Sequence, residues 1–255
     1  MKIQKSDIAA LALFLCSCAA FLIFNADYIT LLSDGTANKL LCESVSRCIA
    51  AVCYAAVCVI LGCKSALFGK REQPFRNLLW CLPCLLVAVV NFPFSALMSG
   101  SAQVDRSDLT ALFLFKCFSI GLMEEILFRG LLQTLLKDLF RTKKRPLFLT
   151  VAVSAALFGL FHLANLFGGA SLPATLLQVG YSFLLGAMFS AITLKTGTVW
   201  TAVAVHTLFD IGGLLVSDLG HGAPQDTVFW ILTAVFGVLC ALHIIFYLKK
   251  LDSPQ

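Results

Sequence analysis

Charged side chains are scarce in this chain. They make up 13% of its 255 residues, against 59% hydrophobic residues, and the mean hydropathy is +0.90. Soluble domains carry roughly 25% charged residues, so the composition excludes that class. Linkers rich in Pro, Gly or Ser, runs of like charge and internal repeats are lacking as well. We therefore predict a single integral membrane domain over residues 1–255.

The eleven cysteines do not indicate a disulfide framework. Most of them lie in apolar stretches, where a cysteine behaves as a small hydrophobic residue. Cys81 and Cys84 form a C-x-x-C pair, but Leu82 and Pro83 between them belong to a hydrophobic run. We therefore expect these thiols to pack in the protein interior, and we assign them no redox or metal role.

Apolar stretches of about 20 residues, the length that spans a bilayer as a helix, recur along the chain. They cover residues 8–24, 48–68, 78–98, 109–136, 147–167, 172–194, 198–216 and 227–248. The sequence thus predicts an all-α, polytopic membrane protein with about eight transmembrane helices in the lipid bilayer.

Basic residues are concentrated in alternate loops between these spans, and acidic residues in the others. Because Lys and Arg gather in cytoplasmic loops, both termini are predicted to be cytoplasmic. This pattern accounts for the formal net charge of +5, and no nucleic-acid partner is expected. The basic loops hold Lys2, Lys5, Lys64, Lys70, Arg71, Arg76, Lys137, Arg141, Lys143, Lys144, Arg145, Lys195, Lys249 and Lys250, and the opposite loops Asp27, Asp34, Asp105, Asp108, Asp218 and Asp226.

The N-terminus allows two interpretations. Lys2 and Lys5 before an apolar stretch resemble the start of a signal peptide, and the residues around Cys16 and Cys18 loosely resemble a cleavage site. The apolar run continues to Phe24, however, which favours a retained first helix.

Few ionisable residues fall well inside the predicted spans. A charge near the bilayer centre costs at least ~2.5–3.5 kcal/mol, so each needs a partner or a function. Lys116 is expected to extend outward to the membrane surface. The others are Glu124, Glu125 and Arg129 in the span 109–136, His162 in the span 147–167, and His206 and Asp210 in the span 198–216.

The spacing of these residues defines which of them share a helix face. Glu125 and Arg129 are i and i+4, one turn apart, and are expected to form an ion pair. Glu124 is rotated by about 100° from Glu125 around the helix axis and is therefore available for a role other than this ion pair. His206 and Asp210 are again i and i+4 on one face.

The expected depths of these side chains overlap. From the predicted cytoplasmic ends, and at 1.5 Å per residue, Glu124 lies about 20 Å deep and His162 about 22 Å. By the same rise, His206 lies about 12 Å and Asp210 about 18 Å deep. Asn165 follows His162 by one turn. Three helices therefore bring polar groups to one region of the membrane.

Carboxylates and imidazoles in such a region can activate water. A carboxylate can take a proton from water and pass it to a leaving amine. Two imidazoles can ligate Zn²⁺ or donate hydrogen bonds to a developing oxyanion. The H-E-x-x-H zinc motif is absent, so metal ligands would have to come from separate helices. The residues predict a buried polar site with hydrolytic capability, but they do not name a reaction.

Three motifs in these spans resemble those of the CPBP family of CAAX proteases and bacteriocin-processing enzymes, also called the Abi family. They are E-E-x-x-x-R from Glu124 to Arg129, F-x-x-x-H from Phe158 to His162, and H-x-x-x-D from His206 to Asp210. The resemblance extends over residues 109–216. It implies a core bundle of the CPBP/Abi type with its catalytic core in that range.

The resemblance also implies roles for the motif residues. Glu124 is expected to activate the water that attacks the scissile carbonyl. His162 and His206 are expected to ligate a metal or to stabilise the oxyanion, and Asp210 to complete that cluster. The supporting residues are then Glu125, Arg129, Phe158 and Asn165.

A Zn²⁺ cofactor is one of two mechanisms that the resemblance leaves open, the other being a metal-free one. Zinc in catalytic sites has three protein ligands and a water. Glu124 has to remain free as the base, so the predicted ligands are His162, His206 and Asp210. Eukaryotic prenyl-protein proteases of the family have Asn where this chain has Asp210. A carboxyl group there favours metal binding or a protonated acid over oxyanion donation.

We thus expect an intramembrane endopeptidase, a metalloprotease if zinc is used, that acts on a membrane-associated protein or peptide. A prenylated CAAX-type tail and a leader peptide both fit a site that is accessible from lipid. Two other classes remain open. A proton- or metal-coupled transporter also uses buried carboxylates and histidines, and a non-catalytic immunity or adaptor protein can share the fold.

Overall fold

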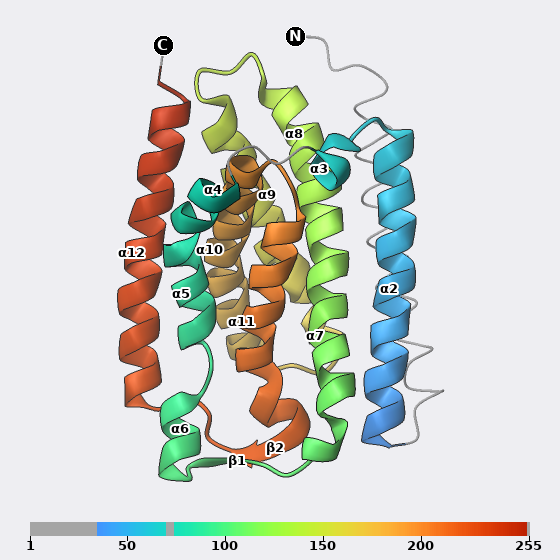
Figure 1. Cartoon of the computed structure of the whole chain (residues 1–255), viewed down its shortest axis with the longest axis vertical. Coiled ribbons are helices and arrows are strands. Elements are labelled where there is room, and N and C mark those ends of the chain that lie inside the picture. The colour runs from blue at the N-terminus through green and yellow to red at the C-terminus, as the bar shows by residue number, and fades with distance from the viewer. Residues whose placement is uncertain (1–34, 70–73, 254–255) are drawn as a thin grey trace.

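The computed structural model describes residues 35–69 and 74–253. This part of the chain is a bundle of helices, joined at one end by a short two-stranded sheet (Figure 1). The main helices are α2 (Thr36–Ile60), α5 (Leu82–Val90), α7 (Thr110–Glu125), α9 (Pro146–Phe161), α10 (Leu172–Thr196), α11 (Trp200–Leu219) and α12 (Thr227–Leu251).

Shorter elements connect these helices. The strands β1 and β2 pair in antiparallel fashion, with Gln103 opposite His221. The short helices are α3 (Ser65–Phe68), α4 (Pro74–Trp80), α6 (Phe94–Ser99) and α8 (Gln133–Phe140); the other elements are β1 (Ala102–Val104), η1 (Ser107–Leu109), the π-helical η2 (Ile126–Leu132), η3 (His162–Leu166) and β2 (Gly220–Gly222).

Six helical stretches of the described residues are long and apolar enough to cross a membrane. They are Thr36–Ile60, Leu82–Ser99, Pro146–Leu166, Leu172–Thr196, Trp200–Leu219 and Thr227–Leu251. The all-α membrane fold is thereby confirmed, whereas the predicted count of eight is approximate. The predicted span 8–24, the residues before it and the signal-peptide alternative lie outside the described residues.

Two predicted spans differ from the observed helices. The helix predicted from residue 48 begins at Thr36, because Glu43 and Arg47 pair with each other inside the bundle instead of marking a loop. The span predicted over residues 109–136 is an uninterrupted helical run, but it changes from the α-helix α7 through the π-helical η2 to α8. This run is not among the six stretches.

Small residues allow the central helices to approach one another closely. A Cβ atom on Gly121 of α7 would lie 3.0 Å from Thr207 Oγ1 of α11. On α9, a Cβ atom on Gly159 would lie 2.8 Å from the carbonyl oxygen of Val179 on α10. The backbones of α7 and α11, and of α9 and α10, are therefore in near contact around the buried charged residues.

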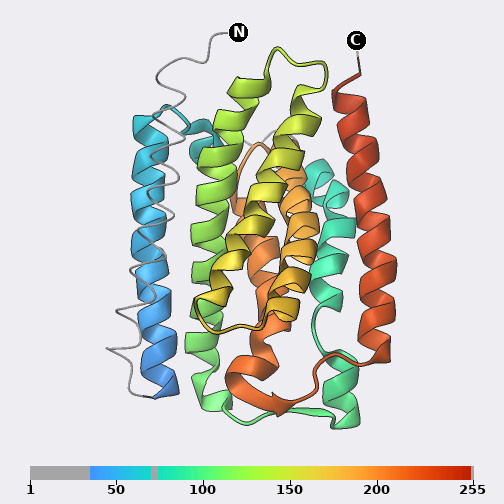
Figure 2. The ribbon, with the colours of Figure 1, turned by 180° about the vertical axis from the view of Figure 1, so that it is seen from behind.

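The helices at the edges of the bundle enclose this centre. Figures 1 and 2 show α2 beside α7 at one edge and α12 beside α5 at the other, with α11 between α7 and α5. The loop between α8 and α9 lies at the same end as the C-terminal end of α12, and β1 and β2 lie at the opposite end. The basic loop 141–145 and the acidic side chain of Asp105 are thus at opposite ends of the bundle, as the charge alternation requires.

Candidate active site

Glu125 and Arg129 form a buried ion pair at the junction of α7 and η2. The distance from Arg129 Nη1 to Glu125 Oε1 is 3.1 Å, and both side chains are 0% exposed. Arg129 Nη2 also donates a hydrogen bond of 3.1 Å to the carbonyl oxygen of Gly186 on α10. The ion pair expected from the i, i+4 spacing is present, and it ties α7 and η2 to α10.

Aromatic rings surround the guanidinium of Arg129. Its Cζ atom lies 4.3 Å from the ring centroid of Phe158, 5.3 Å from that of Phe189 and 5.8 Å from that of Phe128. Such cation–π contacts are worth about 2 kcal/mol or more when water is excluded. Phe158, a predicted supporting residue, therefore belongs to the shell around the arginine.

His206 of α11 joins the same cluster from the other side of Glu125. Its Nδ1 atom lies 2.8 Å from Glu125 Oε1, and its ring stacks on Phe189 at 4.6 Å with an interplanar angle of 17°. Because a carboxylate accepts and does not donate, this contact assigns a proton to Nδ1. Glu125 thereby fixes the orientation of the imidazole, and Nε2 points away from it.

Glu124 and Asp210 face the Nε2 atom of His206. Glu124 Oε2 lies 3.9 Å from Nε2, and Asp210 Oδ2 lies 3.6 Å from it. Both oxygen atoms are buried and have no hydrogen-bond partner among the described residues. Buried polar atoms are paired in most native structures, and the exceptions concentrate at catalytic or binding sites. The side chains themselves are 12% and 13% exposed, so the position between them is close to the protein surface but not open to it.

His162 and Asn165 lie on the border of this cluster, where α9 changes into η3. His162 Nδ1 donates a hydrogen bond of 2.9 Å to the carbonyl oxygen of Phe158, which leaves Nε2 available. The rings of His162 and His206 both pack against Phe158, with centroid distances of 5.1 and 6.0 Å. Asn165 donates instead to Gln178 Oε1 on α10, at 2.7 Å, and this contact holds η3 against α10.

A zinc site requires a defined number of ligand atoms close to the metal. Zinc takes three or four ligands at about 2.0–2.3 Å from the metal. No group of three His, Cys, Asp or Glu side chains in residues 35–69 and 74–253 is arranged to hold a metal ion. The predicted ligands His162, His206 and Asp210 therefore do not form such a group among the described residues.

Sequence reasoning did not identify two residues that shape this site. Phe189 stacks on His206 and contacts Arg129, and Gly186 supplies the carbonyl that receives the arginine. Both lie on α10, whose one charged residue, Lys195, is in its last turn and gave no indication of a role for this helix. Phe189 is one of 22 phenylalanines, and nothing in the sequence distinguishes it from the others. Its role follows only from the packing of α10 against α9 and α11.

One comparison with known proteins gave a match, over the central part of the chain. Residues 106–212 match the family model described as type II CAAX prenyl endopeptidase Rce1-like. This part of the chain is similar to an Rce1-like domain. No curated protein and no solved structure matches the chain. The Rce1-like match includes all three motifs, and it supports a CAAX-endopeptidase type of protease for this integral membrane protein.

Proposed function

We propose that this protein is an intramembrane endopeptidase that hydrolyses a peptide bond with a water molecule activated by Glu124. The observation that carries the proposal is the buried carboxylate oxygen of Glu124, which has no hydrogen-bond partner among the described residues and faces His206 and Asp210. The Rce1-like domain supports the same class of reaction. The catalytic residues we propose are Glu124, His162, His206 and Asp210.

Each step then has a group to perform it. Glu124 takes a proton from the water, and the resulting hydroxide attacks the scissile carbonyl carbon. The carbonyl oxygen becomes an oxyanion, to which Nε2 of a doubly protonated His206 donates a hydrogen bond, and Nε2 of His162, also protonated on both nitrogens, is a second donor. Glu124 returns the proton to the amide nitrogen as the C–N bond breaks, which leaves a new carboxyl group and a free amine. Asp210 accepts a hydrogen bond from the second hydrogen of the water.

Glu125 and Arg129 contribute to this reaction by positioning the imidazole of His206. Glu125 holds the proton on His206 Nδ1 and fixes the plane of the ring. Arg129 neutralises Glu125 and is itself held by Gly186 and by the Phe158 ring. Because the imidazole is already held in its orientation, no free energy is needed to orient it when the reaction occurs.

Zinc assistance remains our prediction for the cofactor and is tested by chelation. If zinc is used, 1,10-phenanthroline abolishes cleavage, added Zn²⁺ restores it, and the purified protein contains close to one zinc ion per chain. The variants His162→Ala and His206→Ala then bind almost no zinc. Full activity in protein shown to be metal-free by elemental analysis would contradict the zinc prediction and leave the mechanism above unchanged.

The substrate that we propose is a membrane-associated protein or peptide, of the prenylated CAAX type or with a leader segment. Purified protein in detergent is incubated with a library of such peptides, and the cut sites are mapped by mass spectrometry. We expect cleavage at defined bonds by the wild type and none by Glu124→Gln. Absence of cleavage in every peptide by folded wild type would favour the transporter or adaptor class instead.

A further inference from the structure

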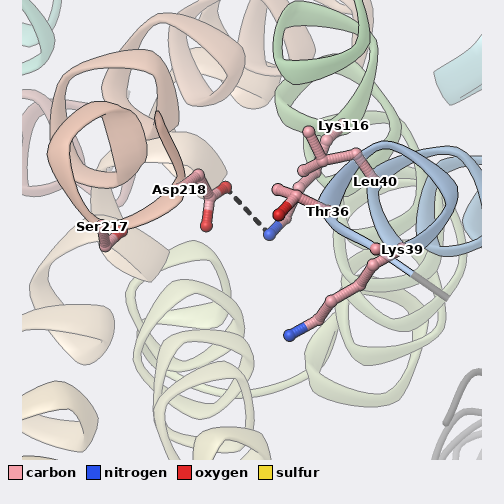
Figure 3. Close-up of a pocket in the computed structure, with 7 residues that line it drawn as sticks. Thr36, Lys39, Leu40, Lys116, Ser217 and Asp218 are labelled. Atoms are coloured by element: carbon pink, nitrogen blue, oxygen red, sulfur yellow. Dashed lines mark ion pairs between the residues drawn. The ribbon is translucent and has the colours of Figure 1, made fainter. Parts of the chain in front are cut away.

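Helix α11 carries two of the proposed catalytic residues, and side chains hold it to neighbouring helices near both of its ends. At its start, the indole N–H group of Trp200 donates a hydrogen bond of 2.9 Å to the carbonyl oxygen of Leu67 on α3. Near its end, Asp218 Oδ2 lies 2.9 Å from Lys116 Nζ on α7 (Figure 3). The proposed catalytic residues of α11 lie between these two contacts.

The contact near the end of α11 involves a lysine that was predicted to extend outward to the membrane surface. Lys116 Nζ also lies 3.1 Å from Glu43 Oε2 on α2, and Arg47 pairs with the same carboxylate at 3.3 Å. The prediction for Lys116 is therefore wrong, because two carboxylates hold its ammonium group inside the bundle. The cluster lies beside a pocket of about 390 Å³ between α2, α7 and α11.

Asn91, the residue at the end of α5, contacts the middle of α11. Its side chain is 9% exposed, and its Nδ2 atom donates a hydrogen bond of 2.7 Å to the carbonyl oxygen of Phe209. This carbonyl belongs to the peptide group that joins Phe209 to Asp210. Because a buried donor without a partner costs free energy, the bond ties α5 to the peptide group directly before Asp210.

Two successive glycines of α11 allow this approach. A Cβ atom on Gly212 would lie 2.7 Å from the backbone nitrogen of Phe92, and one on Gly213 would lie 2.9 Å from Asn91 Nδ2. The first would collide with backbone, and the second would displace the amide that makes the hydrogen bond. Glycine in a helix interior is destabilising relative to alanine. The turn after Asp210 is therefore weak on its own, and the contact with Asn91 stabilises it.

The α5 side of this contact is an interruption in a membrane-spanning stretch. The stretch Leu82–Ser99 is long and apolar enough to cross a membrane, but α5 ends at Val90 and α6 begins at Phe94. Pro93 between them has no N–H group to continue the helix. Non-helical backbone at membrane depth occurs where it is buried in protein or lines a cavity. Here it packs against Gly212 of α11.

We propose that Asn91 is a positioning residue, which aligns Asp210 for hydrolysis by fixing the peptide group before it. The inference rests on the proposed function, in which Asp210 accepts a hydrogen bond from the attacking water. Asp210 Oδ2 lies 3.6 Å from His206 Nε2 and receives no hydrogen bond from the described residues. The backbone of α11 therefore determines where this oxygen lies. Asn91 is outside residues 106–212, so the Rce1-like match assigns it no role.

Kinetics with a cleaved peptide provide the first test. Asn91→Leu keeps the approximate volume of the side chain and removes the donor. It should lower kcat by roughly tenfold, equivalent to about 1.4 kcal/mod in the barrier, and leave KM unchanged, because Asp210 acts in the chemical step. Trp200→Phe is the matched control, since it also removes a hydrogen bond that anchors α11 to a backbone carbonyl. It should lower thermal stability and leave both constants unchanged. An unchanged kcat in Asn91→Leu would overturn the proposal.

A double-mutant cycle separates positioning of Asp210 from a general loosening of the bundle. Asp210→Ala removes the group that Asn91 is proposed to align. Adding Asn91→Leu to Asp210→Ala should therefore lower the residual kcat no further, because residues that act as a unit have non-additive effects. A general structural effect would multiply the two losses. A double variant that shows both losses in full would contradict a role through Asp210.

Hydrogen exchange tests the contact without any substrate. In folded Asn91→Leu, the amides of residues 206–216 should exchange roughly tenfold faster than in wild type, measured by mass spectrometry of peptides from protein in detergent. Trp200→Phe should leave exchange in this segment unchanged. Unchanged exchange in Asn91→Leu would overturn the proposal, whether or not the protein is a protease. Folded wild type that cleaves no peptide would refute the proposed function and the positioning role with it, even if exchange changed as expected.

Discussion

Two clusters of charged side chains lie inside this protein, and they differ in how their charges are stabilised. In the cluster of the proposed active site, Glu125 and Arg129 are 0% exposed, and aromatic rings and a backbone carbonyl complete the surroundings of the arginine. In the cluster around Lys116, Glu43 and Asp218 neutralise the amine at 12% to 16% exposure, beside a pocket. The first cluster is stabilised by fixed dipoles and rings, the second by opposite charges and by access to solvent.

This difference indicates what each cluster is able to do. The fully buried Glu125–Arg129 pair holds the imidazole of His206 in one orientation, and its burial strengthens the electrostatic interactions between these groups. The partly exposed cluster around Lys116 leaves its charges within reach of solvent, which screens them. The comparison also predicts that removing a charge costs more in the first cluster than in the second.

Arg129→Ala should have the largest effect on stability. The change leaves Glu125 as an unpaired, fully buried charge, which costs about 3–5 kcal/mol. Folded yield and the thermal transition in detergent should both fall sharply. Glu124→Gln in the same cluster leaves the Glu125–Arg129 pair intact and should change both only slightly. Equal thermal stability of wild type and Arg129→Ala would remove the structural role of the buried pair.

Lys116→Met should have a smaller effect. The two carboxylates it leaves behind are partly exposed, so the expected loss is on the order of 1–3 kcal/mol, measured as unfolding free energy or melting temperature. High salt should reduce the loss because it screens partly exposed charges, whereas the effect of Arg129→Ala should not depend on salt. Lys39→Met is the matched control, since Lys39 lines the same pocket and has no ion pair among the described residues. A loss as large as that of Arg129→Ala would abolish the distinction between the clusters.

Asp226→Asn should have the smallest effect, and one that depends on pH. Asp226 precedes α12, where hydrogen bonds from the Phe229 N–H group and from the Ser95 hydroxyl lower the pKa of its carboxyl below the usual value. A lowered pKa in the folded state contributes stability above the unfolded pKa of about 4, and this contribution is lost as the pH falls through the folded value. The melting temperature of Asp226→Asn should therefore be lower than that of wild type at neutral pH, and the difference should shrink in acid. A difference that does not change with pH would contradict this assignment.

The features that follow from local periodicity could be predicted from the sequence. Apolar runs indicated the helices, because a bilayer requires about 20 apolar residues per span. The i, i+4 spacing indicated the Glu125–Arg129 pair, and the motif order indicated the family to which residues 106–212 match. These predictions depend only on neighbours within one helix or on the order of helices along the chain.

Features that depend on contacts between helices could not be predicted in this way. Lys116 was expected at the lipid surface, since its partners Glu43 and Asp218 lie on two other helices. Phe189 was missed because its neighbours Arg129 and His206 come from elsewhere in the chain. The change to a π-helical segment at Ile126 also left no mark that a hydropathy pattern detects.

The central claim, that Glu124 activates the attacking water, is tested most directly by cleavage with wild type and Glu124→Gln in ¹⁸O-labelled water. The wild type should place one labelled oxygen in the new carboxyl group. Glu124→Gln should cleave about 10²–10⁴-fold more slowly, the usual contribution of general base catalysis. Its thermal stability should equal that of wild type, which separates loss of the base from loss of the fold. Cleavage by folded Glu124→Gln at the wild-type rate would contradict the account.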